Sequence, residues 1–437
     1  MNEIIFAPAT AIGNAAISII RVSGKGCSKV LKKLINKQLP KNKVLALREV
    51  YFPKKGHVID RCLVCWMPKS SSYTGEDSFE IQCHGGIAVM NSFYDALLSF
   101  KNVRFAEQGE FTKRAIMNGK INLIHAEAIN DLVKSETEQQ RILALKQFKG
   151  GLSNNIDKWR KTLLKAMSSV EAKIDFSDED DVPEDILFKE SLLALKNEIT
   201  LTLENSKHYE LIKEGVKVVL TGKANAGKSS LFNFIIKNEK SIVTNIPGTT
   251  RDAIEYKINI KGYPVTIIDT AGINKTDDII EIEGIKRAKE QMDKADLILN
   301  VIDCTSFGKE EISKKYWNIL NKTDKNHILN IEKSMPNLFK VSAKTGEGVE
   351  ALMQEIYKFI RFNTKKIRST EFFHSSQRQK KELENTMMVL EEAIKEKQEE
   401  IIAEHLRSAN TYLKKIIGEV DIEEVLGEIF SSFCIGK

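Results

Sequence analysis

The residues from Gly222 to Ser229 read Gly-Lys-Ala-Asn-Ala-Gly-Lys-Ser, which is the spacing of a phosphate-binding P-loop. Its glycines let backbone N–H groups close around phosphate oxygens, Lys228 can reach the β- and γ-phosphates, and Ser229 can place its hydroxyl on Mg²⁺. A strand-like run, 216–220, precedes the loop and an apolar helical pattern follows it. The sequence therefore predicts a nucleoside triphosphate site on Asn225, Ala226, Gly227, Lys228, Ser229 and Ser230.

Two further elements follow in the order that such a site needs. Asp269-Thr270-Ala271-Gly272 ends an expected strand, where the aspartate would meet Mg²⁺, directly or through water, and Gly272 would offer an N–H to the γ-phosphate. Thr250, in the segment 248–252, is the expected switch threonine for the metal. Alternation over 254–260 before Lys261-Gly262 predicts a hairpin beside that switch.

Guanine recognition is expected from Asn321-Lys322-Thr323-Asp324, because the Asp324 carboxylate can accept both N1–H and N2–H of guanine and has no such partner in adenine. Ser342-Ala343-Lys344 follows an expected strand, where a backbone N–H contact to guanine O6 would be sought. The register of this motif is open. The strand before Asn321 is short, and a rival strand at 327–331 is followed by residues that cannot read guanine in the same way.

The group that drives hydrolysis is not fixed by these motifs. Ras-like switches carry a glutamine directly after the Asp-x-x-Gly element, but Ile273 stands at that place. No arginine lies in the loop 274–280, so an arginine finger is not supplied there. Asn225 could instead hold a monovalent cation near the phosphates. The nearby acids that could orient water are Asp277, Asp278, Glu281 and Glu283.

The elements that position these residues form an α/β plus all-α fold. Short strand-like runs and glycine turns indicate an α/β domain over 1–118, and helical spacing of apolar residues follows over 119–212. Strands and helices alternate over 213–364, and helical spacing returns over 365–437. This order predicts a discontinuous helical domain into which a Ras-like P-loop GTPase domain is inserted.

Composition sets further limits. The chain has 42% hydrophobic and 29% charged residues and no long apolar run, so we expect no membrane association. Its first residues, MNEIIFAP, contain an acid and no basic residue before the apolar stretch, which argues against a secretory signal and predicts a cytoplasmic location. A net charge of +6 is compatible with a nucleic-acid partner. Six scattered cysteines favour reduced thiols, although Cys62-x-x-Cys65 with Cys83-His84 leaves a weak zinc alternative.

Longer segments resemble the MnmE (TrmE) family of tRNA modification GTPases. The likeness rests on the P-loop, on 244–252 (TNIPGTTRD), on 269–272 with Asp278-Ile279-Ile280-Glu281, and on the terminal Phe433-Cys434-Ile435-Gly436-Lys437. It extends over nearly the whole chain through 21–24 (RVSG), 73–80 (YTGEDSFE), 109–115 (GEFTKRA) and 118–120 (NGK).

For the GTPase domain, the resemblance implies that two subunits meet across their nucleotide faces, with K⁺ in place of an arginine finger. By position, Mg²⁺ would be held by Ser229 and Thr250, and K⁺ by Asn225, Thr244, Ile246 and Thr249. Asn245 would also lie at the GTP. Glu281 would orient the attacking water through a second water, and the alternative is that it is a solvated acid.

The resemblance also implies a tetrahydrofolate-binding, dimer-making N-terminal domain with Arg21, Glu80, Lys120 and Lys437 at a 5,10-methylenetetrahydrofolate, for which 5-formyltetrahydrofolate is an analogue. Each of these residues could otherwise form a surface ion pair. Cys434 is expected to be a thiol of the modification site, and a packed small hydrophobe is its alternative. Prenylation is rejected, since Gly436 and Lys437 suit that signal poorly.

The expected function is therefore GTP hydrolysis by a homodimer that works with the FAD-carrying flavoprotein MnmG (GidA) in a heterotetramer or larger complex. Together they would add a carboxymethylaminomethyl or aminomethyl group to C5 of the wobble uridine, U34, of certain tRNAs. Two alternatives stay open: a GTPase switch that binds RNA or assembles ribosomes without modifying tRNA, and a scaffold that binds nucleotide without turnover.

Overall fold

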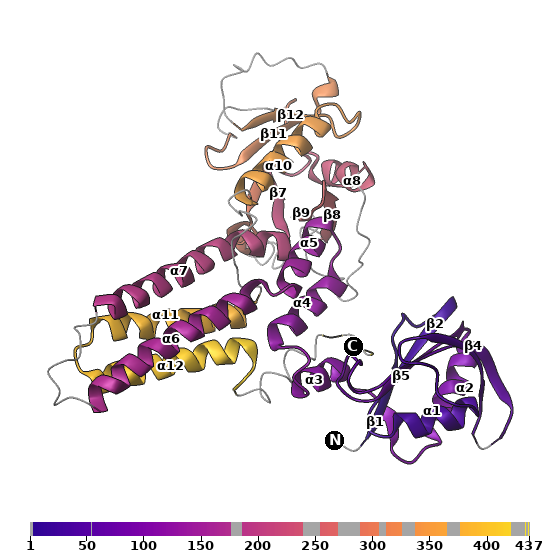
Figure 1. The fold of residues 1–437 in the computed structure, drawn as a ribbon. Coiled ribbons are helices and arrows are strands. Elements are labelled where there is room, and N and C mark those ends of the chain that lie inside the picture. Colours follow the sequence, from indigo (N-terminus) through magenta and orange to yellow (C-terminus); the bar gives the residue numbers. More distant parts are fainter. Residues whose placement is uncertain are drawn as a thin grey trace, which may run out of the picture. The chain divides into compact units, whose positions relative to one another are not determined.

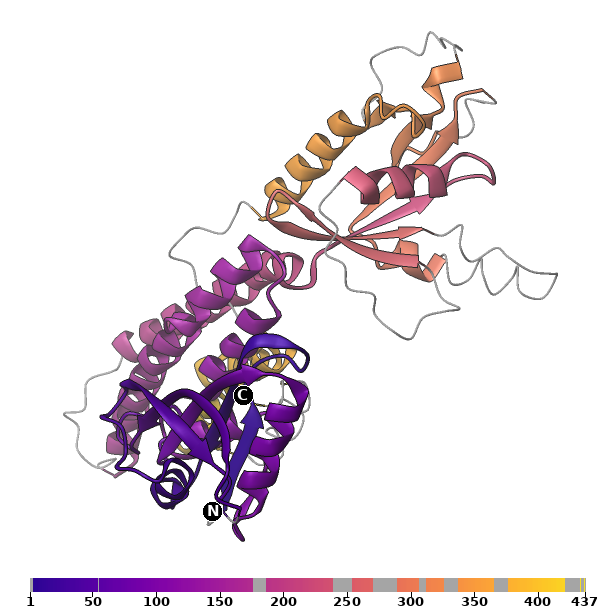
Figure 2. The same ribbon diagram turned by 90° about the vertical axis from the view of Figure 1, so that its right-hand side faces the viewer.

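The structure is a computed structural model that describes residues 3–53, 55–175, 186–238, 254–269, 289–305, 312–325, 337–364 and 376–420, with Phe433 and Gly436. Its contacts divide the chain into two compact units. Unit 1 comprises residues 1–130, 156–180 and 388–437, and unit 2 comprises residues 131–155 and 181–387. Figures 1 and 2 show the ribbon in two views. The units are described separately below.

Unit 1 contains a six-stranded sheet with the order β3-β4-β5-β2-β1-β6. The strands are β1 Ile4–Pro8, β2 Ala15–Ser23, β3 Leu45–Tyr51, β4 Val58–Met67, β5 Ser78–Gly85 and β6 Val103–Phe105. Neighbours run antiparallel except for the parallel pair β1 and β6. Two helices, α1 Cys27–Ile35 and α2 Ile87–Leu98, bury their apolar faces in one core with this sheet. The predicted α/β character of the N-terminal region is confirmed.

The cysteines considered for zinc lie on this sheet. Cys62 and Cys65 are three residues apart on β4, and side chains alternate along a strand, so their thiols face opposite sides. Cys62 and Cys83 are buried in the core, and burial raises the pKa of Cys62 to about 12 and that of Cys83 to about 11. Within the described ranges no group of three His, Cys, Asp or Glu side chains could hold a metal ion.

The remaining helices of unit 1 include α3 Glu110–Met117 and α12 Glu399–Ile417, together with parts of α4 Leu123–Lys134, α6 Gly151–Asp175 and α11 Gln377–Lys395. Ion pairs join α6 to α12: Arg160 bonds Glu419 just beyond α12 at 2.9 Å, and Arg407 bonds Glu171 at 3.0 Å. Gly418 ends α12 with a φ of 81°. A Cβ at Gly418 would lie 3.1 Å from the Leu123 Cβ, so the end of α12 packs closely on the start of α4.

Unit 2 contains a second six-stranded sheet, with the order β12-β11-β10-β7-β9-β8. The strands are β7 Val216–Thr221, β8 Ile254–Ile260, β9 Tyr263–Asp269, β10 Leu297–Asp303, β11 Trp317–Asn321 and β12 Leu338–Lys340. All neighbours are parallel except the hairpin β8–β9, which the alternating residues predicted. Its helices include α5 Glu138–Phe148, α7 Ile186–Glu214, α8 Lys228–Asn238 and α10 Val349–Thr364. The predicted Ras-like α/β class is confirmed.

Ligands of open parallel sheets bind beyond the carboxyl ends of the strands. In unit 2 these ends carry the P-loop after β7, Asp269 at the end of β9, Asp303 at the end of β10 and Asn321 at the end of β11. The topology therefore gathers the predicted nucleotide residues along one edge of the sheet. No helix within the described ranges is both long and apolar enough to cross a membrane.

Candidate functional site

The P-loop backbone is shaped by glycines whose Cβ atoms have no room. Gly222 has a φ of 137°, and a Cβ there would lie 2.1 Å from the Val301 carbonyl oxygen. Gly227 has a φ of 92°, and its Cβ would lie 2.2 Å from Nδ2 of Asn321. Asn225 between them has a positive φ of 61°, which asparagine tolerates better than most residues. The loop is thus packed tightly between β10 and β11.

Lys228, predicted to bind phosphate, and Ser229 and Asp269, both predicted near Mg²⁺, lie at this loop. Lys228 donates from Nζ to the carbonyl oxygens of Gly222 and Lys223, at 2.9 Å each. Burial lowers the pKa of the Lys228 ammonium, and the nearby Asp269 carboxylate acts in the opposite sense. Ser229 donates from Oγ to Oδ2 of Asp269 at 2.8 Å. A hydroxyl and a carboxylate in contact are the hard oxygen donors that suit Mg²⁺.

The base-reading motif is held from both sides. Asn321 donates from Nδ2 to the Ala226 carbonyl at 3.0 Å, and its Oδ1 accepts from the Ala343 N–H at 3.0 Å. Ser342 donates from Oγ to Oδ1 of Asp324 at 2.7 Å, and this hydrogen bond lowers the pKa of the Asp324 carboxyl. The predicted segments 321–324 and 342–344 therefore lie side by side. The rival strand at 327–331 lies outside the described residues.

Asp303, which also lies at this edge of the sheet, was not predicted from the sequence. Lys322 donates from Nζ to the Asn225 carbonyl at 2.7 Å and forms an ion pair with Asp303. Burial tends to raise the pKa of Asp303, but hydrogen bonds from Lys322 and Thr305 outweigh it and lower that pKa to about 2. Asp303 ends the third parallel strand in chain order, after β7 and β9, and this position was the signal that could have identified it.

Several predicted residues lie outside the described part of the chain, so their contacts are not part of this geometry. At the nucleotide these are Thr244, Asn245, Ile246, Thr249, Thr250, Thr270, Ala271, Gly272 and Glu281. At the one-carbon site they are Cys434 and Lys437. Ser230 and Lys344 are exposed within the described ranges.

Two of the residues predicted for the one-carbon site, Arg21 and Glu80, are brought together by the sheet register. Arg21 on β2 lies opposite Glu80 on β5, and Nε of Arg21 donates to Oε1 of Glu80 at 2.9 Å. The guanidinium lies 6.0 Å from the centroid of the Tyr73 ring and 5.8 Å from that of Phe111. These two aromatic residues were not predicted as part of the site. Their rings form an apolar wall beside a partly buried ion pair.

The C-terminal segment reaches the same place. Arg21 donates from Nη1 to the Gly436 carbonyl at 3.2 Å. Phe433 is buried with Ile116, Leu123 and Ala126. A Cβ at Gly436 would lie 2.2 Å from the Pro8 carbonyl oxygen, so only glycine fits there. Gly436 therefore lies at Arg21, whereas the predicted residue Lys437 lies outside the described part of the chain.

Lys120 lies at a neighbouring loop. Its Nζ donates to the Ser70 carbonyl at 3.2 Å, and its side chain flanks Gly75, where a Cβ would come within 3.2 Å of Lys120 Cγ. Tyr73 of this loop contacts Thr112 through its hydroxyl at 2.9 Å, and burial raises the pKa of Tyr73. The loop therefore connects Lys120 with the aromatic wall beside Arg21.

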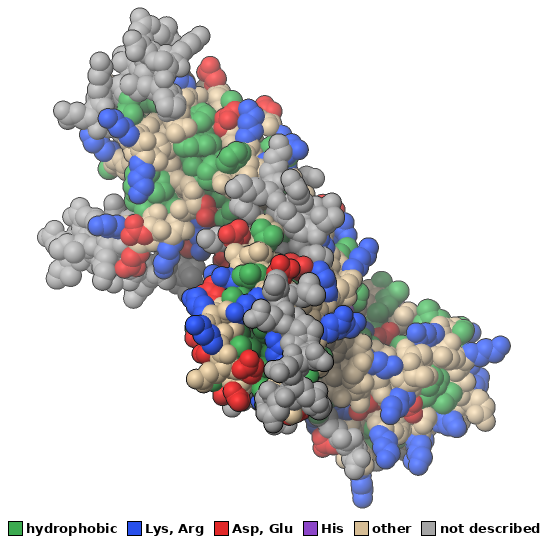
Figure 3. All heavy atoms as spheres, turned by 60° about the vertical axis from the view of Figure 1, so that its left-hand side comes forward, with side chains coloured by type: hydrophobic (Ala, Val, Ile, Leu, Met, Phe, Trp, Pro, Cys, Tyr) green, Lys and Arg blue, Asp and Glu red, His purple; other side chains and the backbone are tan. Residues whose placement is uncertain are grey.

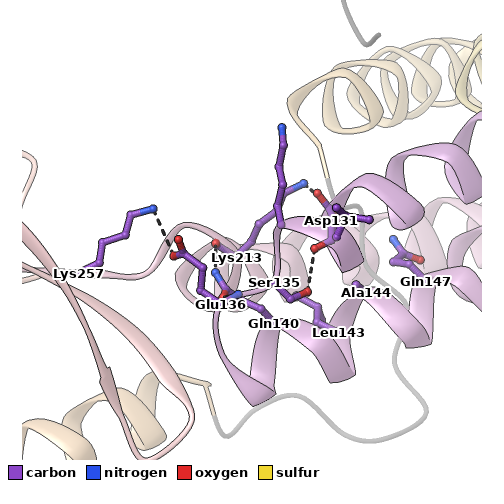
Figure 4. Close-up of a pocket in the computed structure, with 11 residues that line it drawn as sticks. Asp131, Ser135, Glu136, Gln140, Leu143, Ala144, Gln147, Lys213 and Lys257 are labelled. Carbon is purple, nitrogen blue, oxygen red and sulfur yellow. Dashed lines mark hydrogen bonds and ion pairs between the residues drawn. The ribbon is translucent and has the colours of Figure 1, made fainter. Parts of the chain in front are cut away.

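A separate cavity of about 500 Å³ lies in unit 2, where α5 and the end of α7 approach β8 (Figure 4). Lys213 pairs with Asp131 at 2.9 Å and Lys257 with Glu136 at 3.6 Å along its wall. Gln140 donates from Nε2 to the Lys213 carbonyl at 2.9 Å. None of the residues predicted for GTP or folate lines it.

Comparison with known proteins gives matches to two family models. The model "GTP-binding protein TrmE N-terminus" matches residues 4–120, and the model "MnmE helical domain" matches residues 123–434. Among solved structures, the G domain of the T. maritima FeoB iron transporter is 30% identical and covers 33% of this chain and 98% of that chain, with a TM-score of 0.26.

Curated relatives match from end to end. The tRNA modification GTPase MnmE of Pelagibacter ubique (strain HTCC1062) is 41% identical over 447 residues, covering 99% of this chain and 100% of that protein. The tRNA modification GTPase MnmE of Aquifex aeolicus (strain VF5) is 40% identical over 455 residues, covering 100% of both chains. The P-loop geometry, the two family models and these full-length relatives agree, and the chain belongs to the MnmE (TrmE) family of tRNA modification GTPases.

Proposed function

We propose that this chain is a K⁺-dependent GTPase that acts in the cytoplasm with the flavoprotein MnmG (GidA) to modify C5 of U34 in certain tRNAs. The group added is carboxymethylaminomethyl or aminomethyl. Methylenetetrahydrofolate supplies the carbon, the partner carries FAD, and the chain works as a homodimer within a heterotetramer or larger complex. We also propose that residues 1–118 form the folate-binding and dimerisation domain and that residues 213–364 form the GTPase domain. Residues 119–212 and 365–437 then form the two parts of the helical domain.

At the nucleotide, different residues of the chain bind the phosphates, the metal ions and the base. Lys228 neutralises phosphate charge, Ser229 and Thr250 hold Mg²⁺, and Asp324 accepts from guanine. K⁺, held by Asn225, Thr244, Ile246 and Thr249, supplies the positive charge that an arginine finger would otherwise bring to the phosphates. Glu281 orients the attacking water. The contact of Ser229 with Asp269 at 2.8 Å supports the metal assignment, since it places two oxygen donors together.

One observation favours modification over a plain GTPase switch. The Gly436 carbonyl accepts from Arg21, which itself pairs with Glu80 beside two aromatic rings. A switch that only hydrolyses GTP has no use for a C-terminus fixed at an aromatic-walled ion pair in another unit. We assign Arg21, Glu80, Lys120 and Lys437 to the polar groups of a folate, and the thiol of Cys434, two residues before Gly436 in the sequence, to the same reaction.

Nucleoside analysis of tRNA tests this function. Cells that lack the chain should contain unmodified U34 in the target tRNAs, and the wild-type gene should restore the modified nucleoside. A Cys434→Ser gene should fail to restore it, although the variant hydrolyses GTP at the wild-type rate. Wobble uridines that are the same with and without the chain would instead favour the non-modifying switch.

A further inference from the structure

A continuous set of exposed lysines covers α1 and the loop after it. The lysine surface, as we call it, consists of Lys25, Lys29, Lys32, Lys33, Lys37, Lys41 and Lys43, all of them exposed. Every charged residue from Lys25 to Arg48 is basic. Figure 3, in which Lys and Arg are blue, shows basic side chains standing out on the lower right part of the face that it presents. This is a concentrated positive charge in a chain whose net charge is only +6.

The apolar face of α1 is already used. Val30, Leu31 and Leu34 are buried in the core with the sheet, so the helix has no free apolar face to insert into a lipid surface. Lys32 and Lys33 lie in its last turn, where they also favour the helix dipole. That effect does not account for Lys37 or Lys41, which come after the helix.

The loop that carries the later lysines is held in place. The Lys43 N–H donates to the Trp66 carbonyl at 2.8 Å, and the Val44 N–H donates to the Lys41 carbonyl at 3.1 Å. Ser71 donates from Oγ to Oδ1 of Asn42 at 2.8 Å. The backbone of this loop is therefore ordered, so less backbone entropy is lost when its lysines bind a ligand.

The ammonium groups of the lysine surface form no ion pair within the described part of unit 1. Arg104 and Arg114 in the same unit, by contrast, do pair with carboxylates. Lys33 lies 6.0 Å from the centroid of the Phe100 ring. Lysine is depleted at protein–protein interfaces but is a general binder of phosphate. The composition of this surface favours a polyphosphate partner over a protein.

Hydrogen bonds also connect the lysine surface to the proposed one-carbon site. Asn42 contacts Ser71, and the adjacent Ser70 carbonyl accepts from Lys120 at 3.2 Å. Lys120 is one of the residues that we assign to the folate. A strand of RNA lying on the lysine surface would therefore pass beside the loop at 68–72, next to the place where the carbon is expected.

We propose that the lysine surface binds the phosphate backbone of tRNA and positions the anticodon region beside the one-carbon site. This inference rests on the proposed function, because it names the part of the chain that meets the tRNA substrate. Phosphate contacts fix the register of a nucleic acid and carry no sequence information of their own. The surface is thus a positioning device, and the choice of tRNA is made elsewhere.

The test uses the full-length chain and an unmodified tRNA transcript whose wobble base is U34. The variant Lys29→Gln, Lys32→Gln, Lys37→Gln, Lys41→Gln removes four positive charges from the lysine surface. We expect it to bind the transcript about 10- to 100-fold more weakly at physiological salt. The slope of log K against log[salt] should fall by about 2 to 4, since each lost phosphate contact lowers it by about 1.

The matched control is Lys314→Gln, Lys381→Gln, Lys395→Gln, Lys397→Gln, which removes the same charge from exposed, scattered positions. It should bind tRNA as the wild type does, and both variants should hydrolyse GTP at the wild-type rate. An unchanged salt slope in the first variant would overturn the proposal, as would loss of flavoprotein binding with tRNA affinity intact. Failure of the proposed function looks different, because the wild-type chain itself would then leave U34 unmodified.

Discussion

Asp324 is the side chain to which we assign the selection of guanine. Its carboxylate is fixed by Ser342 at 2.7 Å, which leaves acceptor capacity for the two N–H groups of guanine. We predict that Asp324→Asn weakens GTP binding at least about 100-fold, because two hydrogen bonds to a charged group are lost. The same variant should bind xanthosine triphosphate more tightly than GTP, since an amide N–H₂ can donate to the xanthine O2. Equilibrium binding of both nucleotides measures the switch.

The control for that prediction is Ser342→Ala. It removes the hydroxyl that orients Asp324 but keeps the carboxylate, so affinity should fall by less and guanine should still be preferred. If Asp324→Asn kept the preference for guanine, Asp324 would not be the base-reading residue. The register of the motif would then have to be sought in the rival segment after 327–331.

Among the structural elements, α3 is tied to the first strands of unit 1 by a buried arginine. Arg114 is 1% exposed and bonds Glu76 at 3.0 Å, Glu110 at 2.9 Å and the Glu3 carbonyl at 3.0 Å. Burial works against ionisation of Glu110, but hydrogen bonds from Arg104, the Glu107 N–H and Arg114 outweigh it and lower the pKa of Glu110 to about 2. The charged network thus joins α3, β1 and the loop before β5.

We predict that Arg114→Met lowers the free energy of unfolding of the 3–120 region by about 3 kcal/mol at pH 7, because it removes the buried cation that Glu76 and Glu110 share and leaves Glu110 with Arg104 alone. Urea unfolding read by pulsed hydrogen exchange of peptides from this region measures the loss. Arg141→Met removes an exposed pair with Glu138 and should cost far less, because solvent screens exposed ion pairs. An equal cost for the two variants would show that the buried network is not stabilising.

The pH dependence of the same difference has a definite sign. The pKa of Glu110 is lower in the folded chain, at about 2, than its ordinary value of 4.5. The stabilisation from its charge is therefore complete above pH 4.5 and is lost as the pH falls toward 2. The gap between wild type and Arg114→Met should shrink over that interval.

How far the sequence predicts these elements depends on how local the signal is. The P-loop, the hairpin β8–β9 and the short strand β11 were predicted because turn residues and strand alternation are written in neighbouring positions. Asp303 and the aromatic pair Tyr73 and Phe111 were missed. Asp303 is placed by the strand order, whereas Tyr73 in a loop and Phe111 on α3 are placed by tertiary packing beside Arg21. No local pattern of residue types or spacing predicts such long-range contacts.

In our proposal the whole chain combines a site for GTP hydrolysis with a site for carbon transfer. Unit 2 holds the P-loop against its own strands, and unit 1 holds the C-terminal Gly436 against Arg21. Our central claim is that GTP hydrolysis in unit 2 is required for carbon transfer in unit 1.

The measurement that tests this claim is the yield of modified U34 in a reconstituted reaction. The purified chain, the flavoprotein partner, methylenetetrahydrofolate, glycine or ammonium and an unmodified tRNA transcript are combined in K⁺ buffer. We predict modified nucleoside with GTP, and little or none with a GTP analogue that cannot be hydrolysed or when Na⁺ replaces K⁺. The same yield with the analogue as with GTP would contradict the account, because hydrolysis would then play no part in the modification.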